Sequence, residues 1–324
     1  MADWRATLEQ LLLLLERSKS PRGRTEAALE LVALAEGHPE RYAELEPAVP
    51  RLLASKQEEL RRVGVRLAAL VLEEKDAESL LTSRLADPGA LVRMEATGQL
   101  ADLALPSSRG ALAAALEDAA YEVRFEAARG MAALKHPAGL DVLLEALDQG
   151  DFRFRALGAL GELGDARALE PVRRVFRRWL LNMFERTSAA AVMARLGDPE
   201  GARYLVQRTR VRKAPDRQMA IELCGEVQVE GGREKLLEIL RDRKDPARGA
   251  AARGLGRYRD PSLEAELSRV LDEGSLGDDL VLDVAEGLLF LGGEPARQRA
   301  AEAAEKLASD AAREELRMML EENP

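Results

Sequence analysis

A repeat of about 31 residues constrains the fold of this chain more than any other feature of the sequence. Its clearest copy spans residues 118–147, and we count positions from Arg124 as the anchor. Small or apolar residues follow the anchor at fixed intervals: Ala127, Met131, Leu134, Leu143 and Leu147. The first three share one face of an α-helix, and Pro137 ends that helix before a second helix begins. Each copy therefore predicts a helix pair that buries its apolar face only against neighbouring copies.

The same columns return along the chain, with an arginine as the anchor of every copy but the last. The anchors are Arg24, Arg62, Arg93, Arg124, Arg153, Arg186, Arg217, Arg248 and Val281. Ala, Leu, Glu and Arg are strong helix formers, and we find no segment with the alternation of a β-strand. We therefore predict an all-α solenoid of about nine helix pairs in a single repeat domain over residues 1–324. Residues 1–22 and 309–324 are expected to form caps around repeats at residues 23–308.

The fifth copy offers two possible anchors. Arg155 has the more regular spacing from its neighbours, but counting from it places Asp165 and Arg174 in core columns. Counting from Arg153 places Leu163 and Val172 there instead, so Arg153 is the anchor. The next copy then begins late, and the extra residues fall at 177–185, which marks an irregular junction.

Composition excludes several classes of site. A lone cysteine, Cys224, excludes an internal disulfide framework, and its core column predicts a buried, unreactive thiol. His38 and His136 lie far apart, without metal-ligand spacing, and no cofactor motif is present. The leucine run at residues 11–15 is too short to span a bilayer and has no signal-peptide flanks. We expect a cytoplasmic protein with no cofactor and no membrane insertion.

The repeat resembles the HEAT-like repeats, in the short form named after phycobilisome lyases. The resemblance rests on Asp87, Pro88, Val92 and Arg93, on the run from Ala156 to Asp165, and on residues 196–199, and it covers residues 24–307. It implies a right-handed α/α superhelix whose second helices line the concave face. It also implies that the anchor arginines pair with acidic residues near helix starts, as a ladder between copies. The candidate acidic partners are Asp87, Asp118, Asp242 and Asp245.

Charge is distributed unevenly along the chain. Residues 1–150 carry a net charge of −7, residues 151–217 carry +7, and residues 218–324 carry −9. Two basic clusters account for the middle: Arg173, Arg174, Arg177 and Arg178, then Arg208, Arg210, Arg212 and Lys213. If second helices line the concave face, the two clusters should lie near each other there. Guanidinium groups suit carboxylates or phosphates, although neighbouring acids would equally make this a solvated face.

Apolar residues accompany the first cluster. Val172, Val175, Phe176 and Trp179 have the spacing of one helical stripe, and Met183 and Phe184 follow at the irregular junction. We expect these aromatic residues to fill the core of a widened junction. The alternative is an exposed hot spot beside the arginines, in which Trp179 contacts a partner.

These features favour a non-enzymatic scaffold or adaptor that uses its concave face and the basic central patch to bind a protein with an acidic or phosphorylated surface. The predicted contact residues are the two basic clusters and Trp179. Nucleic-acid binding is a second hypothesis, which the net charge of −9 disfavours. A phycobilin-lyase-like chromophore enzyme is a third, and it rests on the resemblance alone.

Overall fold

The computed structural model describes residues 4–274 and 276–323, and all regular structure in those ranges is helical. The chain divides into two compact units, residues 1–149 and residues 150–324. The helices of the first unit are α1 (Trp4–Arg17), α2 (Pro21–Gly37), α3 (Tyr42–Leu45), α4 (Ala48–Leu53), α5 (Glu58–Val71), α6 (Glu74–Arg84), α7 (Ala90–Leu103), α8 (Arg109–Ala115), α9 (Tyr121–Ala133) and α10 (Leu140–Ala146). Residues 1–3 of the predicted N-terminal cap lie outside the described ranges.

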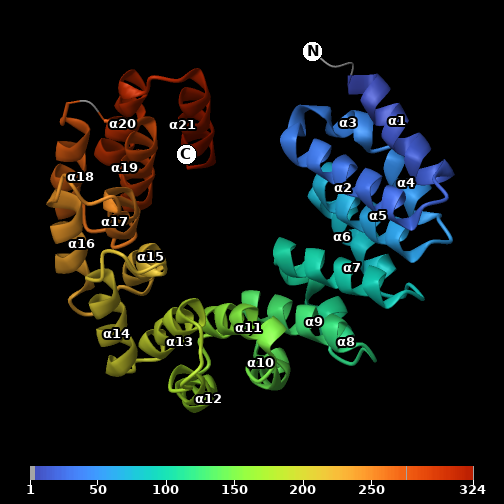
Figure 1. Cartoon of the computed structure of the whole chain (residues 1–324), viewed down its shortest axis with the longest axis horizontal. Coiled ribbons are helices and arrows are strands. Elements are labelled where there is room, and N and C mark those ends of the chain that lie inside the picture. The colour runs from blue at the N-terminus through green and yellow to red at the C-terminus, as the bar shows by residue number, and fades with distance from the viewer. Residues whose placement is uncertain (1–3, 275, 324) are drawn as a thin grey trace. The chain divides into compact units, whose positions relative to one another are not determined.

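The second unit continues the same alternation of longer and shorter helices. Its helices are α11 (Gly150–Leu163), α12 (Leu169–Phe176), α13 (Met183–Arg195), α14 (Pro199–Thr209), α15 (Arg217–Val227), α16 (Gly232–Arg241), α17 (Arg248–Gly256), α18 (Glu264–Leu271), α19 (Asp278–Leu291), α20 (Glu294–Glu302) and α21 (Asp310–Glu322). Within each unit, successive helix pairs stack on one another (Figure 1). The predicted all-α solenoid of HEAT-like helix pairs is confirmed, and the single-domain assignment stays a prediction.

The predicted small column explains how the first helices of each pair pack together. Ala127, Ala156, Ala189, Ala220 and Ala251 are all fully buried. In the second unit, glycines bring helix backbones into direct contact: a Cβ on Gly225 would overlap Gly254, and one on Gly256 would overlap the carbonyl of Gly287. Helices α15, α17 and α19 therefore lie closer together than side chains would otherwise allow.

This close packing sets the direction in which the second unit bends. Its first helices, α13, α15, α17 and α19, lie on the inner side of the bend, and α12, α14, α16 and α18 lie on the outer side (Figure 1). The expectation that second helices line the concave face is therefore wrong for this unit. The row of helices with the smaller residues is the shorter row, so the stack curves toward it.

Several anchor arginines form the expected ladder with acidic residues of the next copy. Arg93 donates through Nε and Nη2 to both carboxylate oxygens of Asp118, at 2.7 and 2.9 Å. Arg217 likewise donates two hydrogen bonds to Asp245, from Nη1 to Oδ1 at 2.8 Å and from Nη2 to Oδ2 at 2.7 Å. Burial opposes ionisation of Asp245, but the Arg217 guanidinium and a backbone N–H outweigh it and lower the pKa of this carboxyl. Adjacent copies are thus joined by charge-assisted hydrogen bonds.

Several positions of the ladder differ from the sequence prediction. Arg124 donates to the backbone carbonyls of Asp118 and Ala119, at 2.8 and 3.1 Å. In the second copy the anchor is Arg61, which binds both oxygens of Asp87 at 2.9 and 2.8 Å. Arg62 instead lies near the surface beside Glu59 and Glu95. The candidate partner Asp242 accepts from Arg212, which is not an anchor.

Candidate partner-binding surface

The two basic clusters come together at one edge of the second unit. Helix α12 ends at Phe176 and leads through residues 177–182 into α13, while α14 ends at Thr209 and leads through residues 210–216 into α15. Helix α13 contacts the end of α14 and the connection after it, because Nη2 of Arg208 lies 3.9 Å from Sδ of Met183 and Thr187 donates to Asp216 at 2.7 Å. We call this region the edge surface, defined by Arg174, Arg177, Arg178, Trp179, Leu180, Phe184, Arg210, Val211, Arg212 and Lys213.

Part of the predicted basic cluster is neutralised within the chain. Arg173 donates to Asp198 at 2.9 Å and also pairs with Glu170. Arg208 binds Asp216, at 2.7 and 2.8 Å through its Nε. Asp198 and Asp216 are buried, so these pairs with Arg173 and Arg208 belong to the packing of the fold.

Two other arginines form ion pairs that stay accessible to solvent. Arg177 pairs with Glu200 at 2.7 Å, with 61% of the arginine side chain exposed, and Arg212 pairs with Asp242. Arg174 and Lys213 are exposed and form no ion pair among the described residues. The edge surface is therefore basic at its rim, and its charge density is lower than the sequence alone indicates.

The buried aspartates beneath this edge are held in the ionised form. Burial alone would raise the pKa of Asp198, but the bond from Arg173 and the Glu200 N–H outweigh it and lower the pKa. Asp216 behaves alike: burial opposes ionisation, while Arg208 and the Thr187 hydroxyl lower its pKa overall. These ionised carboxylates bind arginines near the ends of α12 and α14 and hold the helix ends beneath the edge surface in place.

The apolar residues at the junction project into solvent. Trp179 is 85% exposed and Leu180 is 90% exposed, while Met183, Phe184 and Val211 are also exposed. The expectation that Trp179 fills the core is wrong. Because α12 ends at Phe176, three residues before Trp179, the apolar stripe ends with Val172, Val175 and Phe176, which are buried.

Arg186 holds the connection that presents Trp179 and Leu180. This anchor donates from Nη1 to the carbonyl of Phe176 at 3.1 Å, and from Nη2 to the carbonyls of Arg178 at 2.8 Å and Trp179 at 3.4 Å. In neighbouring copies the equivalent guanidinium binds an acidic residue of the next copy. The sixth anchor therefore organises the junction backbone and fixes it with its apolar side chains outward. Sequence analysis named Arg186 only as an anchor and did not single out Leu180; the displaced start of the sixth copy was the available signal for both.

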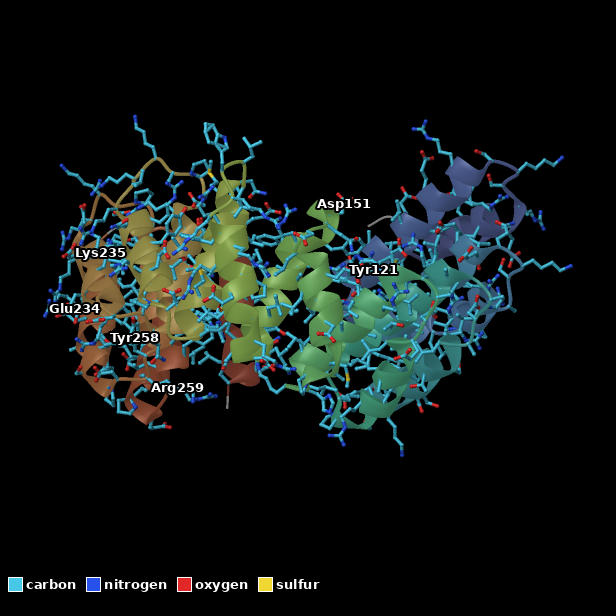
Figure 2. The ribbon with its side chains drawn as sticks, turned by 90° about the horizontal axis from the view of Figure 1, so that it is seen from below. Tyr121, Asp151, Glu234, Lys235, Tyr258 and Arg259 are labelled. Atoms are coloured by element: carbon cyan, nitrogen blue, oxygen red, sulfur yellow. The ribbon has the colours of Figure 1, made fainter. Side chains whose placement is uncertain are left out.

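The other candidate reactive groups belong to the fold. Cys224 is fully buried, and burial raises the pKa of its thiol to about 12. Tyr258 donates its hydroxyl to the carbonyl of Cys224 at 3.3 Å, and Figure 2 labels it in the second unit. His136 accepts a hydrogen bond from Ala138 N–H in a turn, and His38 packs edge-on against Trp4. Within residues 4–274 and 276–323, no three metal-ligating side chains converge.

The repeated helix pairs and their arginine–aspartate ladder define a helical-repeat protein. Residues 109–179 match the family model for HEAT repeats, and the flanking copies carry the same columns. Over these residues the chain is similar to HEAT repeats. Comparison with curated proteins gives no match. No helix in the described part of the chain is long and apolar enough to cross a membrane.

Comparison with solved structures finds several similar chains. An engineered protein is 19% identical, with 98% of each chain covered and a TM-score of 0.42. The complex of CpcE and CpcF of phycocyanin lyase from Nostoc is 18% identical, with 85% of this chain and 93% of that chain covered and a TM-score of 0.44. Kap121p is 14% identical, with 99% of this chain and 44% of that chain covered and a TM-score of 0.45. At these identities and TM-scores, none of the three bears on function.

Proposed function

We propose that this chain is a non-catalytic scaffold that binds a protein partner through the edge surface. Trp179 and Leu180 insert into an apolar site on the partner. Arg174, Arg177 and Lys213 contact acidic or phosphorylated groups around that site.

The observation that carries the proposal is the exposure of Trp179 and Leu180 on a backbone that Arg186 holds in place. A segment whose backbone is already held loses less conformational freedom on binding, and tryptophan and arginine are enriched among residues that dominate interface energetics. Arginines at the rim favour carboxylates and phosphates, which accept two parallel hydrogen bonds from one guanidinium. The inner face of the bend, where we first expected binding, has no role in this proposal.

The test compares partner capture by the native chain and by a W179S/L180S variant, with bound proteins quantified by mass spectrometry. The two side chains are exposed, so the variant should keep the helical circular dichroism spectrum of the native chain. Loss of two hot-spot side chains is expected to weaken a specific partner by at least about thirtyfold. A partner list unchanged in the variant contradicts the proposal.

One control variant and one charge-reversal variant test whether the loss of capture is specific to the edge surface. Leu29→Ser alters a leucine that is 55% exposed in the first unit and should leave capture unchanged. Arg174→Glu reverses a rim charge that serves no ion pair, and it should weaken capture in a salt-dependent way. Phosphatase treatment of the partner distinguishes the two anion types, because only a phosphorylated partner loses affinity.

A further inference from the structure

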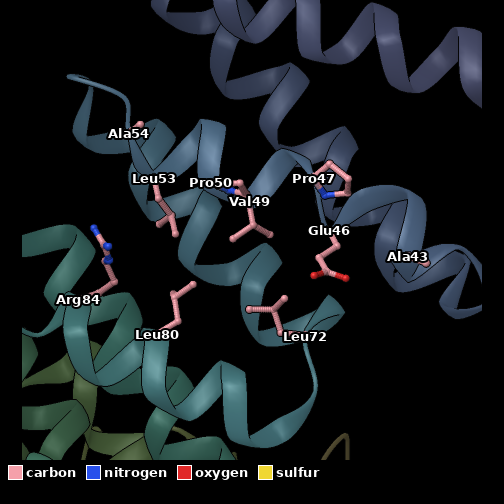
Figure 3. A pocket seen from close by; sticks show the side chains of 10 residues that line it. All are labelled: Ala43, Glu46, Pro47, Val49, Pro50, Leu53, Ala54, Leu72, Leu80 and Arg84. Atoms are coloured by element: carbon pink, nitrogen blue, oxygen red, sulfur yellow. The ribbon is translucent and has the colours of Figure 1, made fainter.

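A pocket of about 750 Å³ lies in the first unit, along α4 and beside α6 (Figure 3). Its walls are mainly apolar and include Val49, Leu53, Leu72 and Leu80. The second element of the first copy is interrupted here: α3 ends at Leu45, and α4 begins only at Ala48, after Pro47. The volume and the apolar lining match those of pockets that bind small molecules.

Arg84 lines this pocket and occupies a column that is apolar in most other copies. Leu81, three residues earlier, aligns with the buried Leu112, Leu143, Val172, Leu205, Leu236 and Leu267. The position of Arg84 then corresponds to Ala115, Ala146, Val175, Arg208, Ile239 and Val270. The other arginine in this column, Arg208, is neutralised by the buried Asp216.

Among the described residues, Arg84 forms no ion pair or hydrogen bond with an acid, although, beside the hydrogen bonds from Arg61, its charge helps to lower the pKa of the buried Asp87. Its Nε is buried without a hydrogen-bond partner, and no ion pair in the described residues includes it. The nearest acid in sequence is Asp87, but Arg61 occupies both oxygens of that carboxylate and the Gly89 N–H binds one of them. A buried N–H without a hydrogen-bond partner is costly, and a bound carboxylate would accept a hydrogen bond from this Nε.

The second charged residue of the pocket restricts the ligand further. Glu46 lies on the side of the pocket opposite Arg84, with the apolar residues between them (Figure 3). A negative charge at that end repels a second anionic group on the ligand. The pocket therefore suits a ligand with one carboxylate and an uncharged apolar body.

From the pocket and the unpaired Arg84 we propose that the first unit binds a small apolar monocarboxylate. The carboxylate accepts hydrogen bonds from Arg84, and the apolar body lies over Leu53, Leu80 and Val49. This site is independent of the edge surface, so either proposal stands without the other.

Isothermal titration calorimetry with decanoate tests the proposal, and decyltrimethylammonium serves as the probe of opposite charge. We expect decanoate to bind the full chain with one-to-one stoichiometry, and the cation to bind at least tenfold more weakly. Arg84→Gln removes the charge and should weaken decanoate binding by about tenfold to hundredfold, without changing the binding of the cation. Leu80→Trp fills the pocket and should abolish decanoate binding.

The control is Arg109→Gln, which removes an exposed arginine of the first unit outside the pocket and should leave binding unchanged. Circular dichroism confirms that each variant is folded before titration. No decanoate binding to the native chain would overturn the proposal. Equal binding by the Arg84→Gln variant would overturn it as well, and so would equal affinity for the two probes.

Discussion

The buried ion pair between Arg217 and Asp245 should contribute more to stability than any exposed ion pair of the chain. The side chains are 6% and 3% exposed, and they form two parallel hydrogen bonds. The Nε of Arg217 also donates to the carbonyl of Thr209 at 2.7 Å, so the guanidinium cannot turn away to solvent without losing a third bond. Asp245→Asn keeps the shape of the side chain but leaves this positive charge buried and unpaired.

Breaking a buried ion pair by removing one partner costs about 3–5 kcal/mol. For a domain of the size of the second unit, about 1 kcal/mol corresponds to roughly 2–4 °C in Tm, so Asp245→Asn should lower the Tm of that unit by about 6–20 °C. Differential scanning calorimetry and urea unfolding followed by circular dichroism measure the shift. Glu314→Gln is the matched control, because Glu314 and Arg317 form an ion pair with both side chains more than half exposed. That change should cost no more than about 1 kcal/mol.

The double variant R217M/D245N separates two contributions to the loss of stability: the lost ion pair itself, and the cost of leaving the Arg217 guanidinium buried without a partner. If the cost of Asp245→Asn comes from the unpaired guanidinium, removing the arginine as well should restore part of the stability. Fully additive costs for Arg217→Met and Asp245→Asn would refute this explanation. So would an Asp245→Asn effect no larger than that of Glu314→Gln.

Four further predictions concern packing, the thiol and pH. Gly256→Ala should destabilise the second unit by about 1–3 kcal/mol in urea unfolding, because its Cβ would overlap the carbonyl of Gly287. Gly158→Ala meets no atom within 4 Å and should stabilise α11 by up to about 1 kcal/mol. Cys224 should react with Ellman's reagent only after denaturation, since its thiol is buried with a pKa of about 12. The pKa of Asp198 lies below its unfolded value of about 3.9, so its stabilising contribution is complete above that value and is lost as pH falls through the folded pKa. Acid titration of the unfolding free energy should therefore be flat near neutral pH and fall below about pH 4.

The sequence was sufficient for features that every copy shares. Columns of small and apolar residues predicted the helix pairs, and the core position of Cys224 followed from its column. The pairing of anchors with Asp87, Asp118 and Asp245 was also predictable, because an identical residue at an identical position performs the same task in each copy. Periodicity determines which residues face inward, and burial then follows.

Features that depend on where a helix ends were not predictable. Trp179 continues the apolar spacing of α12, so periodicity alone assigned it to the core, but the helix ends at Phe176 and the side chain is exposed. Arg61 and Arg62 are adjacent, and spacing from Arg93 favoured Arg62, whereas the position of Asp87 selects Arg61. The direction of bending escaped prediction for a related reason, because it depends on the packing distances summed over two rows of helices.

Function in this chain should therefore be sought where a copy departs from its shared columns. Arg186 leaves the ladder and holds a junction that exposes Trp179 and Leu180. Arg84 replaces an apolar core residue and lacks the acid that neutralises Arg208 in the same column. A repeat solenoid needs neither departure for its stability, since the remaining copies stack without them. An exposed tryptophan on a fixed backbone and an unpaired arginine in an apolar pocket each carry a free-energy cost in the isolated chain, and binding a ligand of matching chemistry would remove that cost.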